Sequence, residues 1–279
     1  MNGILLVDKP AGWTSHDVVA KVRGILHRQA SNSDLSSSHL DVVQGSSEEW
    51  KESYKEVRRL STGVTDAVMR QKSAGVALPR RGQQGKTMRK VKVGHTGTLD
   101  PFATGLLILV VGSYTKRAAE FSKLDKTYEA EVVLGSVSTT GDPEGEITKK
   151  SDKKPSEEEV MAVLEQFKGK YMQMPPSYSA KKINGQRAYK LAREGKEVKL
   201  EPVEVEIYDI TDVVYDFPRL SFTVSVSSGT YIRTLAEDIG EKLGTGAYLS
   251  ALRRTKIGKF DISSSVDVSH ALDAYLIKV

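Results

Sequence analysis

Cysteine is absent from this chain of 279 residues, and histidine occurs only five times. The missing thiols exclude disulfide bonds, a thiolate nucleophile and zinc or iron–sulfur sites held by cysteine. The histidines show no spacing typical of metal ligands; they are His16, His27, His39, His95 and His270. Nucleotide-binding motifs are missing too. Because the chain has neither metal-binding nor nucleotide-binding motifs, we expect no bound metal and no cofactor.

Long apolar runs are also missing. The longest, Leu106–Val111, is far too short to cross a bilayer. The apolar run Gly3–Val7 is too short for a signal peptide, and Lys9-Pro10 ends it. We therefore expect a soluble, cytoplasmic protein that does not associate with membranes. Its hydrophobic content of 39% is sufficient for a sizeable core.

The net charge of +5 is concentrated in one part of the chain. Residues 28–90 hold 12 Lys and Arg against 7 Asp and Glu, which leaves the remainder of the chain neutral. Between Asp66 and Asp100 there are eight basic residues and no acidic one. Such a basic run suits a polyanionic substrate. It is equally typical of a solvated loop with no binding role, and both interpretations stay open.

Apolar periodicity predicts strands and helices in an irregular order. Thr14 with Asp17, and Ser156 with Glu159, are spaced as helix-capping pairs. Residues 248–253 fit either a helix or a strand. The expected helices are 14–26, 47–60, 115–123, 156–167 and 234–243, and the expected strands are 3–8, 106–111, 128–134, 203–214, 220–227 and 256–260. Strands that can pair in antiparallel fashion, with helices placed irregularly among them, indicate the α+β class.

The most informative stretch is Gly94-His95-Thr96-Gly97-Thr98-Leu99-Asp100-Pro101, which directly precedes the apolar run. A residue before proline disfavours the α region, so Asp100 should lie in an extended or turn segment. Loops held by a buried strand often carry catalytic groups. From spacing alone, Asp100 can equally be the cap of a short helix with Pro101 at its first position.

Five blocks in order resemble the motifs of the TruB family of tRNA pseudouridine-55 synthases. The Asp100 block resembles the catalytic motif of that family. The other blocks are Gly3–Gly12, Lys126–Ala130, Gln173–Lys182 and Ser227–Arg233. One such motif would be weak evidence, whereas five in family order are specific. The resemblance implies the pseudouridine-synthase fold, a mixed, mostly antiparallel sheet flanked by helices, with a long insertion after the first helix.

The resemblance implies an isomerase that converts uridine 55 of the tRNA T-loop to pseudouridine without a cofactor. Asp100 would be the nucleophile, and Arg233 would keep its carboxylate ionised and oriented. Tyr128 would stack on the target uracil. Without the motifs, Arg233 would be taken for a surface residue and Tyr128 for a core aromatic.

The same resemblance assigns four residues to substrate binding. The target base must leave its stack, and His95 would fill the vacated place. Tyr231 and Leu252 would line the uracil pocket, although Leu252 also suits the core. Lys9 would support the active-site loop, or be a solvated lysine at the end of a strand.

The resemblance also sets the expected domains and partners. The catalytic domain would comprise 1–27 and 91–265, interrupted by a basic, partly disordered insertion at 28–90. The remaining 266–279 would be a short tail with no RNA-binding PUA domain. The partner would be the T-arm of tRNA, bound by a monomer with no obligate protein partner. The alternatives are a guide-dependent synthase acting on ribosomal RNA and an RNA-folding chaperone of the same family.

The basic segment generates a test of its own. Replacing residues 30–88 with a short Gly/Ser linker should preserve the fold and the rate at saturating tRNA, because the five blocks lie outside it. Affinity at low salt should fall, and the dependence of log affinity on log salt should become shallower by somewhat under one unit per lost phosphate contact. Binding across salt concentrations measures both. Unchanged affinity and slope would show that the segment does not bind RNA.

Overall fold

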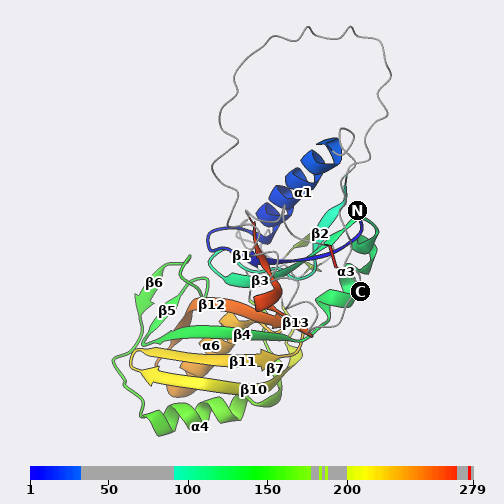
Figure 1. Cartoon of the computed structure of the whole chain (residues 1–279). Helices are drawn as coiled ribbons and strands as arrows, with labels where there is room; N and C mark the ends of the chain where they lie inside the picture. Colours follow the sequence, from blue (N-terminus) through cyan, green and yellow to red (C-terminus); the bar gives the residue numbers. More distant parts are fainter. Residues whose placement is uncertain (33–90, 177–181, 184–185, 188–199, 269–275, 278–279) are drawn as a thin grey trace, which may run out of the picture.

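The computed structural model describes residues 1–32, 91–176, 182–183, 186–187, 200–268 and 276–277. Most of the basic segment, including a helix expected near 47–60, lies outside these residues. Ten strands of the described part form one sheet, in the order β14-β1-β3-β12-β4-β11-β10-β7, with β2 beside β3 and β13 beside β12 (Figure 1). Two pairings, β1 with β14 and β12 with β3, are parallel, and the others are antiparallel. The α+β class and the mixed, mostly antiparallel sheet are confirmed.

The strands of this sheet are β1 (Gly3–Lys9), β2 (Val93–His95), β3 (Thr104–Val111), β4 (Lys126–Leu134), β7 (Gly169–Gln173), β10 (Val203–Asp216), β11 (Arg219–Val226), β12 (Ala247–Ile257), β13 (Phe260–Asp261) and β14 (Val266–Asp267). Two hairpins lie apart from it, formed by β5 (Ser136–Ser138) with β6 (Ile147–Lys149), and by β8 (Lys182–Ile183) with β9 (Gln186–Arg187). The helices are α1 (Ser15–Asn32), α3 (Ala118–Ser122), α4 (Glu157–Phe167) and α6 (Ile232–Leu243). None of the helices in the described residues is long and apolar enough to span a membrane.

The two predicted capping pairs begin helices. The Asp17 carboxylate accepts hydrogen bonds from the backbone N–H and the hydroxyl of Thr14, and the Asp17 N–H donates back to that hydroxyl. Ser156 and Glu159 form the reciprocal pair at the start of α4. At the far end of α6, Gly244 adopts a left-handed conformation (φ 69°), which ends the helix as the sequence predicts.

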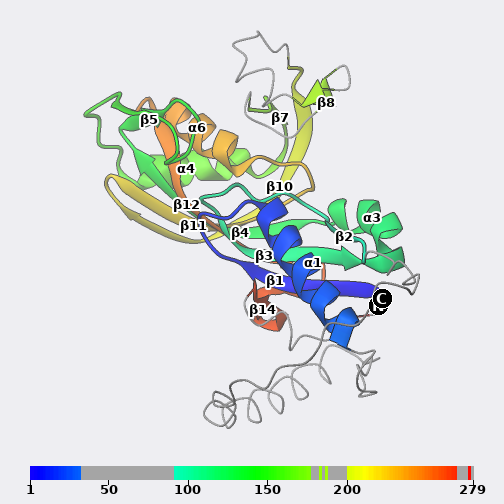
Figure 2. The same cartoon turned by 90° about the horizontal axis from the view of Figure 1, so that it is seen from above.

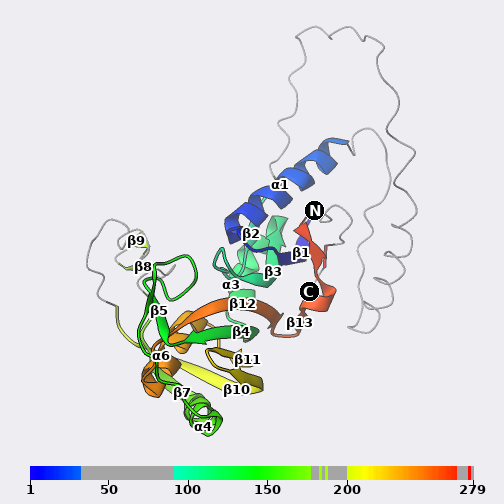
Figure 3. The same ribbon diagram turned by 90° about the vertical axis from the view of Figure 1, so that its left-hand side faces the viewer.

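The core is divided between two halves of the sheet. Helix α1 packs against β1 and β3, where its apolar stripe buries Val18, Val22 and Ile25 (Figure 2). Helices α4 and α6 pack on the half formed by β4, β10, β11 and β12. The halves meet where β12 runs parallel to β3 (Figure 3). Gly105 is required at that junction, because a Cβ there would lie 2.4 Å from the Arg254 carbonyl oxygen.

The structure resolves one open expectation and corrects two others. Residues 248–253, which fitted either a helix or a strand, lie in strand β12. The strand expected at 256–260 is divided between β12, which ends at Ile257, and β13, which begins at Phe260. The helix expected at 115–123 is a 3₁₀ helix, Gly112–Arg117, followed by α3. The Thr115 hydroxyl donates back to the Gly112 carbonyl, so Thr115 lies within the 3₁₀ turn and does not cap a helix.

Candidate active site

The Asp100 loop connects β2 to β3 and is anchored at its centre by the first residue of α1. The Ser15 hydroxyl accepts a hydrogen bond from the Leu99 N–H (2.8 Å) and donates to the Leu99 carbonyl (3.1 Å). Both Ser15 and the Leu99 side chain are buried. The residue next to Asp100 is therefore fixed in position by the core, while Asp100 itself stays about one third exposed.

Two buried cations hold the ends of the same loop. Lys9 is fully buried, and its ammonium donates to the carbonyls of Pro10, Trp13 and Pro101 at 2.7–3.2 Å. Arg254 donates from Nε to the Leu106 carbonyl and from its guanidinium to the Gly97 carbonyl. Burial lowers the pKa of Lys9 to about 8, and the Arg254 charge lowers it further against the opposing influence of Asp100.

Arg233 lies in the first turn of α6 and faces Asp100. Its Nε is 3.0 Å from the Asp100 Oδ2, and its side chain is only 6% exposed. The start of α6 is fixed by Gln173 on β7, whose side chain accepts from the Tyr231 N–H at 2.8 Å and donates to the Tyr231 carbonyl at 3.0 Å. The structure thus brings together Asp100 and Arg233, as the resemblance predicts.

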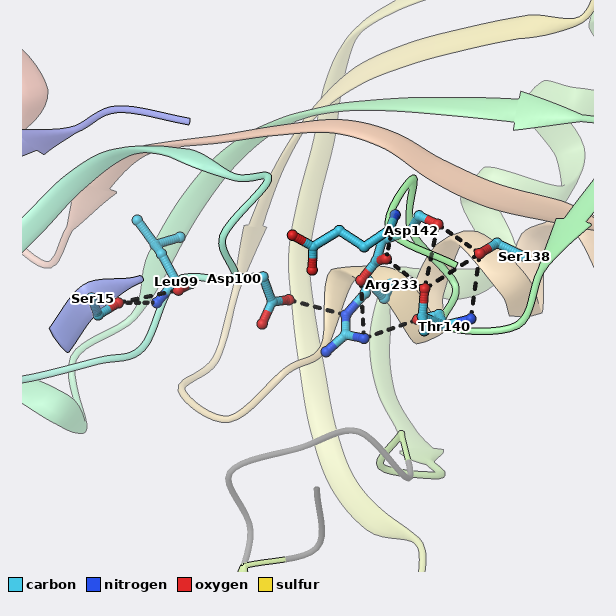
Figure 4. A network of polar contacts seen from close by, with 8 residues as sticks. Ser15, Leu99, Asp100, Ser138, Thr140, Asp142 and Arg233 are labelled. Carbon is cyan, nitrogen blue, oxygen red and sulfur yellow. Dashed lines mark hydrogen bonds and ion pairs between the residues drawn. The ribbon is translucent and has the colours of Figure 1, made fainter. Parts of the chain in front are cut away.

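A second carboxylate, that of Asp142, also pairs with Arg233. Asp142 Oδ2 lies 3.2 Å from the Arg233 guanidinium, which also donates to the Thr140 carbonyl at 2.9 Å (Figure 4). The other Asp142 oxygen accepts from the Thr140 hydroxyl and from the Glu144 N–H. Sequence analysis missed Asp142 and Gln173: the first lies in a segment dense in turn residues, the second within a motif block, and neither signals its distant partner.

The charge state of Asp100 reflects opposing effects. Burial raises the pKa of the Asp100 carboxyl above its ordinary value of 3.8, Arg233 lowers it, and Asp142 raises it again. The net direction is upward, so burial outweighs the ion pair. Arg233 therefore orients the carboxylate and limits the rise in pKa, without bringing the pKa below its ordinary value.

A cavity of about 270 Å³ lies beside this ion pair. Four of its lining residues were expected at the site besides Asp100: Tyr128, Tyr231, Arg233 and Leu252. The two others, Lys9 and His95, are not part of the lining. Lys9 lies beneath the loop, and His95 ends β2 directly before it.

A larger hollow of about 560 Å³ is lined by Glu129, Ala130 and Glu131 of β4, and it shares Leu252 with the smaller cavity. Asp100, Tyr128 and Arg233 line the smaller cavity and not this hollow, so the smaller cavity is the candidate active site.

Two family models match adjoining parts of this chain. Residues 85–232 match the family model described as TruB family pseudouridylate synthase (N terminal domain). Residues 233–278 match the model of the tRNA pseudouridylate synthase B C-terminal domain. The chain belongs to the TruB family. TruB-family relatives that it resembles include tRNA pseudouridine synthase B of Geobacter sulfurreducens, 35% identical over 96% of this chain and 68% of the relative.

A second relative is tRNA pseudouridine synthase B of Thermosipho melanesiensis, 48% identical over 63% of this chain and 58% of the relative. That of Clostridium tetani is 46% identical over 66% of this chain and 64% of the relative. The chain thus spans about 58–68% of the length of these three relatives. Among solved structures, a Cbf5–Nop10–Gar1 complex matches with a TM-score of 0.59 and 24% identity, over 98% of this chain and 54% of the matched chain. This match shows that the two chains share a fold.

The charge network predicts the effect of Asp142→Asn on Asp100. Removing the Asp142 charge eliminates a like charge near Asp100 and takes one anionic partner away from Arg233, so the pKa of Asp100 should fall. Titration of the Asp100 carboxyl carbon by NMR measures this shift. Asp152→Asn, at an exposed surface ion pair, is the matched control and should change nothing. An unchanged or higher pKa in Asp142→Asn would show that Asp142 does not act on Asp100.

Proposed function

We propose that the protein is a tRNA pseudouridine synthase that isomerises uridine 55 in the T-loop. The observation that carries the proposal is the ion pair of Asp100 and Arg233 at a cavity lined by Tyr128. The names of the relatives support tRNA as the substrate class. The reaction breaks the bond from ribose C1′ to uracil N1, and C5 then bonds to C1′. The proton lost from C5 is balanced by the proton gained at N1, so nothing is oxidised and nothing leaves.

Each residue of the cavity has a role in this proposal. Asp100 is the nucleophile, which divides one difficult step into two easier ones. Arg233 holds the carboxylate in one orientation by charge-assisted hydrogen bonding. Tyr128 stacks on the flipped uracil, while Tyr231 and Leu252 enclose it. These groups supply nucleophilic and positioning chemistry that calls for no cofactor.

Two residues outside the lining keep supporting roles. His95, next to the loop, fills the space that the flipped base leaves in the RNA stack. Lys9 fixes the Pro101 end of the loop through its hydrogen bond to that carbonyl. Lys9 is fully buried, so we propose that it acts through the loop instead of binding RNA directly.

Asp100→Asn tests the proposal. The variant should bind a bare tRNA transcript normally and form no more than a trace of pseudouridine, because the carboxylate acts in the chemistry and not in affinity. Carbodiimide mapping at single-nucleotide resolution measures the product and its position. Turnover near that of the wild type would refute the assignment of Asp100. Wild-type modification only with a guide RNA, or RNA refolding without modification, would favour the alternative functions.

Arg233→Lys should lower the rate roughly 10- to 1,000-fold, since lysine cannot reproduce the planar set of contacts to Asp100, Asp142 and the Thr140 carbonyl. Single-turnover kinetics at saturating tRNA measure this loss. Arg219→Lys is a matched control, because that arginine forms an exposed pair with Glu131 on the sheet. Equal rates for Arg233→Lys and the wild type would show that the guanidinium geometry is unimportant.

A further inference from the structure

The cavity is lined by two cations that the proposed chemistry does not use. Lys126 and Arg254 both line it, and their residues are 7% and 1% exposed. Neither forms an ion pair with a carboxylate among the described residues. Arg233, which also lines the cavity, pairs instead with Asp100 and Asp142. The cavity wall therefore holds one cation paired with carboxylates and two buried cations without such a pair among the described residues.

Arg254 is already engaged by the protein backbone. It donates to the carbonyls of Leu106 and Gly97, and thereby fixes the Asp100 loop. Lys126 is engaged far less: its ammonium donates to the Ser122 carbonyl at the end of α3, and no other hydrogen bond of this group is found in the described residues. An ammonium carries three donors, so most of its donor capacity remains available on the cavity wall.

Burial without a counter-charge is costly for an ammonium group. The pKa of Lys126 is lowered to about 8, first by burial and then by the Arg254 charge, with Asp125 opposing. An anion entering the cavity would satisfy the remaining donors and offset this cost. The single hydrogen bond from the Lys126 ammonium to the Ser122 carbonyl does not explain why this ammonium lines the cavity.

The position of Lys126 relative to Tyr128 indicates which anion this is. The two residues stand two apart on β4, on the same face and about 7 Å apart along the strand. A nucleotide whose base stacks on Tyr128 must bring its flanking phosphates along with its ribose. One of these phosphates can then reach Lys126, which is the neighbour of Tyr128 on the same face of the strand.

We propose that Lys126, beside Arg254, forms a binding subsite for a backbone phosphate flanking the target uridine. The proposal rests on the proposed function, because it requires an RNA whose base enters the cavity. Lys126 is a binding residue in this account: it holds the flipped nucleotide by its backbone, while Asp100 and Arg233 act on the ribose and base. The subsite carries no sequence information and fixes the position of the nucleotide.

The test is a cycle that combines Lys126→Met with neutral methylphosphonates placed singly at each phosphate flanking the target uridine of a T-arm stem–loop. At pH 7 and low salt, one methylphosphonate should weaken wild-type binding about 10- to 100-fold. It should also flatten the salt dependence by somewhat under one unit. Lys126→Met should show the same loss with unmodified RNA, and the methylphosphonate should then have no further effect on it.

Controls separate this effect from general charge and folding. Lys170→Met removes an exposed lysine paired with Glu204 and should leave affinity and slope unchanged. Lys126→Arg keeps the positive charge, so it should preserve the dependence of log affinity on log salt. The proposal would be overturned if the affinity losses caused by Lys126→Met and by the methylphosphonate multiply when the two are combined. Normal RNA binding by Lys126→Met would overturn it as well.

If Lys126→Met fails to fold, the binding of methylphosphonate RNAs by the wild-type protein decides the question. Undiminished binding of the RNAs modified at either flanking phosphate excludes a phosphate subsite. Weaker binding of one methylphosphonate RNA by the wild type, together with normal binding of unmodified RNA by Lys126→Arg, supports the phosphate subsite. Pseudouridine formation by the wild type is scored separately. Its absence would refute the proposed function, whereas the binding cycle reports on the phosphate subsite alone.

Discussion

Arg233 bridges two carboxylates from distant parts of the chain, and the geometry of the cavity depends on that bridge. Asp100 comes from the loop before β3, Asp142 from the turn between β5 and β6, and Arg233 from α6. The side chains of Arg233 and Asp142 are both almost completely buried, at 6% and 4% exposed. Removing one member of such a pair typically costs about 3–5 kcal/mol, because it leaves an uncompensated buried charge. The bridge therefore fixes three segments relative to one another.

The bridge acts on a loop that the core already holds. Ser15 fixes Leu99 from α1, Lys9 fixes Pro101 from β1, and Arg254 fixes Gly97 from β12. Three elements that lie far from the loop in the sequence therefore fix it before any substrate binds. Positioning of this kind reduces the conformational entropy that must be lost on reaching a reactive geometry. At the junction of β3 and β12, Gly105 passes close to the Arg254 backbone, and this close approach places Arg254 beside the loop.

Local signals in the sequence predicted the local structure well. The capping pairs Thr14–Asp17 and Ser156–Glu159 form because they need only residues three apart, and Gly244 ends α6 by its own left-handed backbone. Strand β12 was ambiguous for a physical reason. Within the ambiguous residues 248–253, the pairing with β4 shifts its register between Leu249 and Ala251, which interrupts the alternation of a strand. The next residue, Arg254, is fully buried, and distant carbonyls satisfy it. No feature of the local pattern reveals such partners.

The same limit applies to the site. Asp100, Tyr128 and Arg233 were found because the motifs resemble those of a family, and spacing alone left Asp100 as a possible helix cap. Asp142 was hidden because its carboxylate makes two kinds of contact at once. One oxygen organises its own turn through Thr140 and Glu144, as the turn composition suggests, and the other crosses to α6. Its local role is readable in the sequence, and its long-range role requires the fold.

The electrostatic balance of Asp100 follows from this arrangement. A fully neutralising partner would depress the pKa of the carboxyl and stabilise its charge in the resting protein. Arg233 is instead shared with Asp142, whose own charge raises the pKa of Asp100, and burial raises it further. The carboxylate is thus held in one orientation at a higher free energy, relative to its protonated form, than in water. Sharing one guanidinium between two carboxylates provides orientation without full charge compensation, which is the combination that a nucleophilic carboxylate needs.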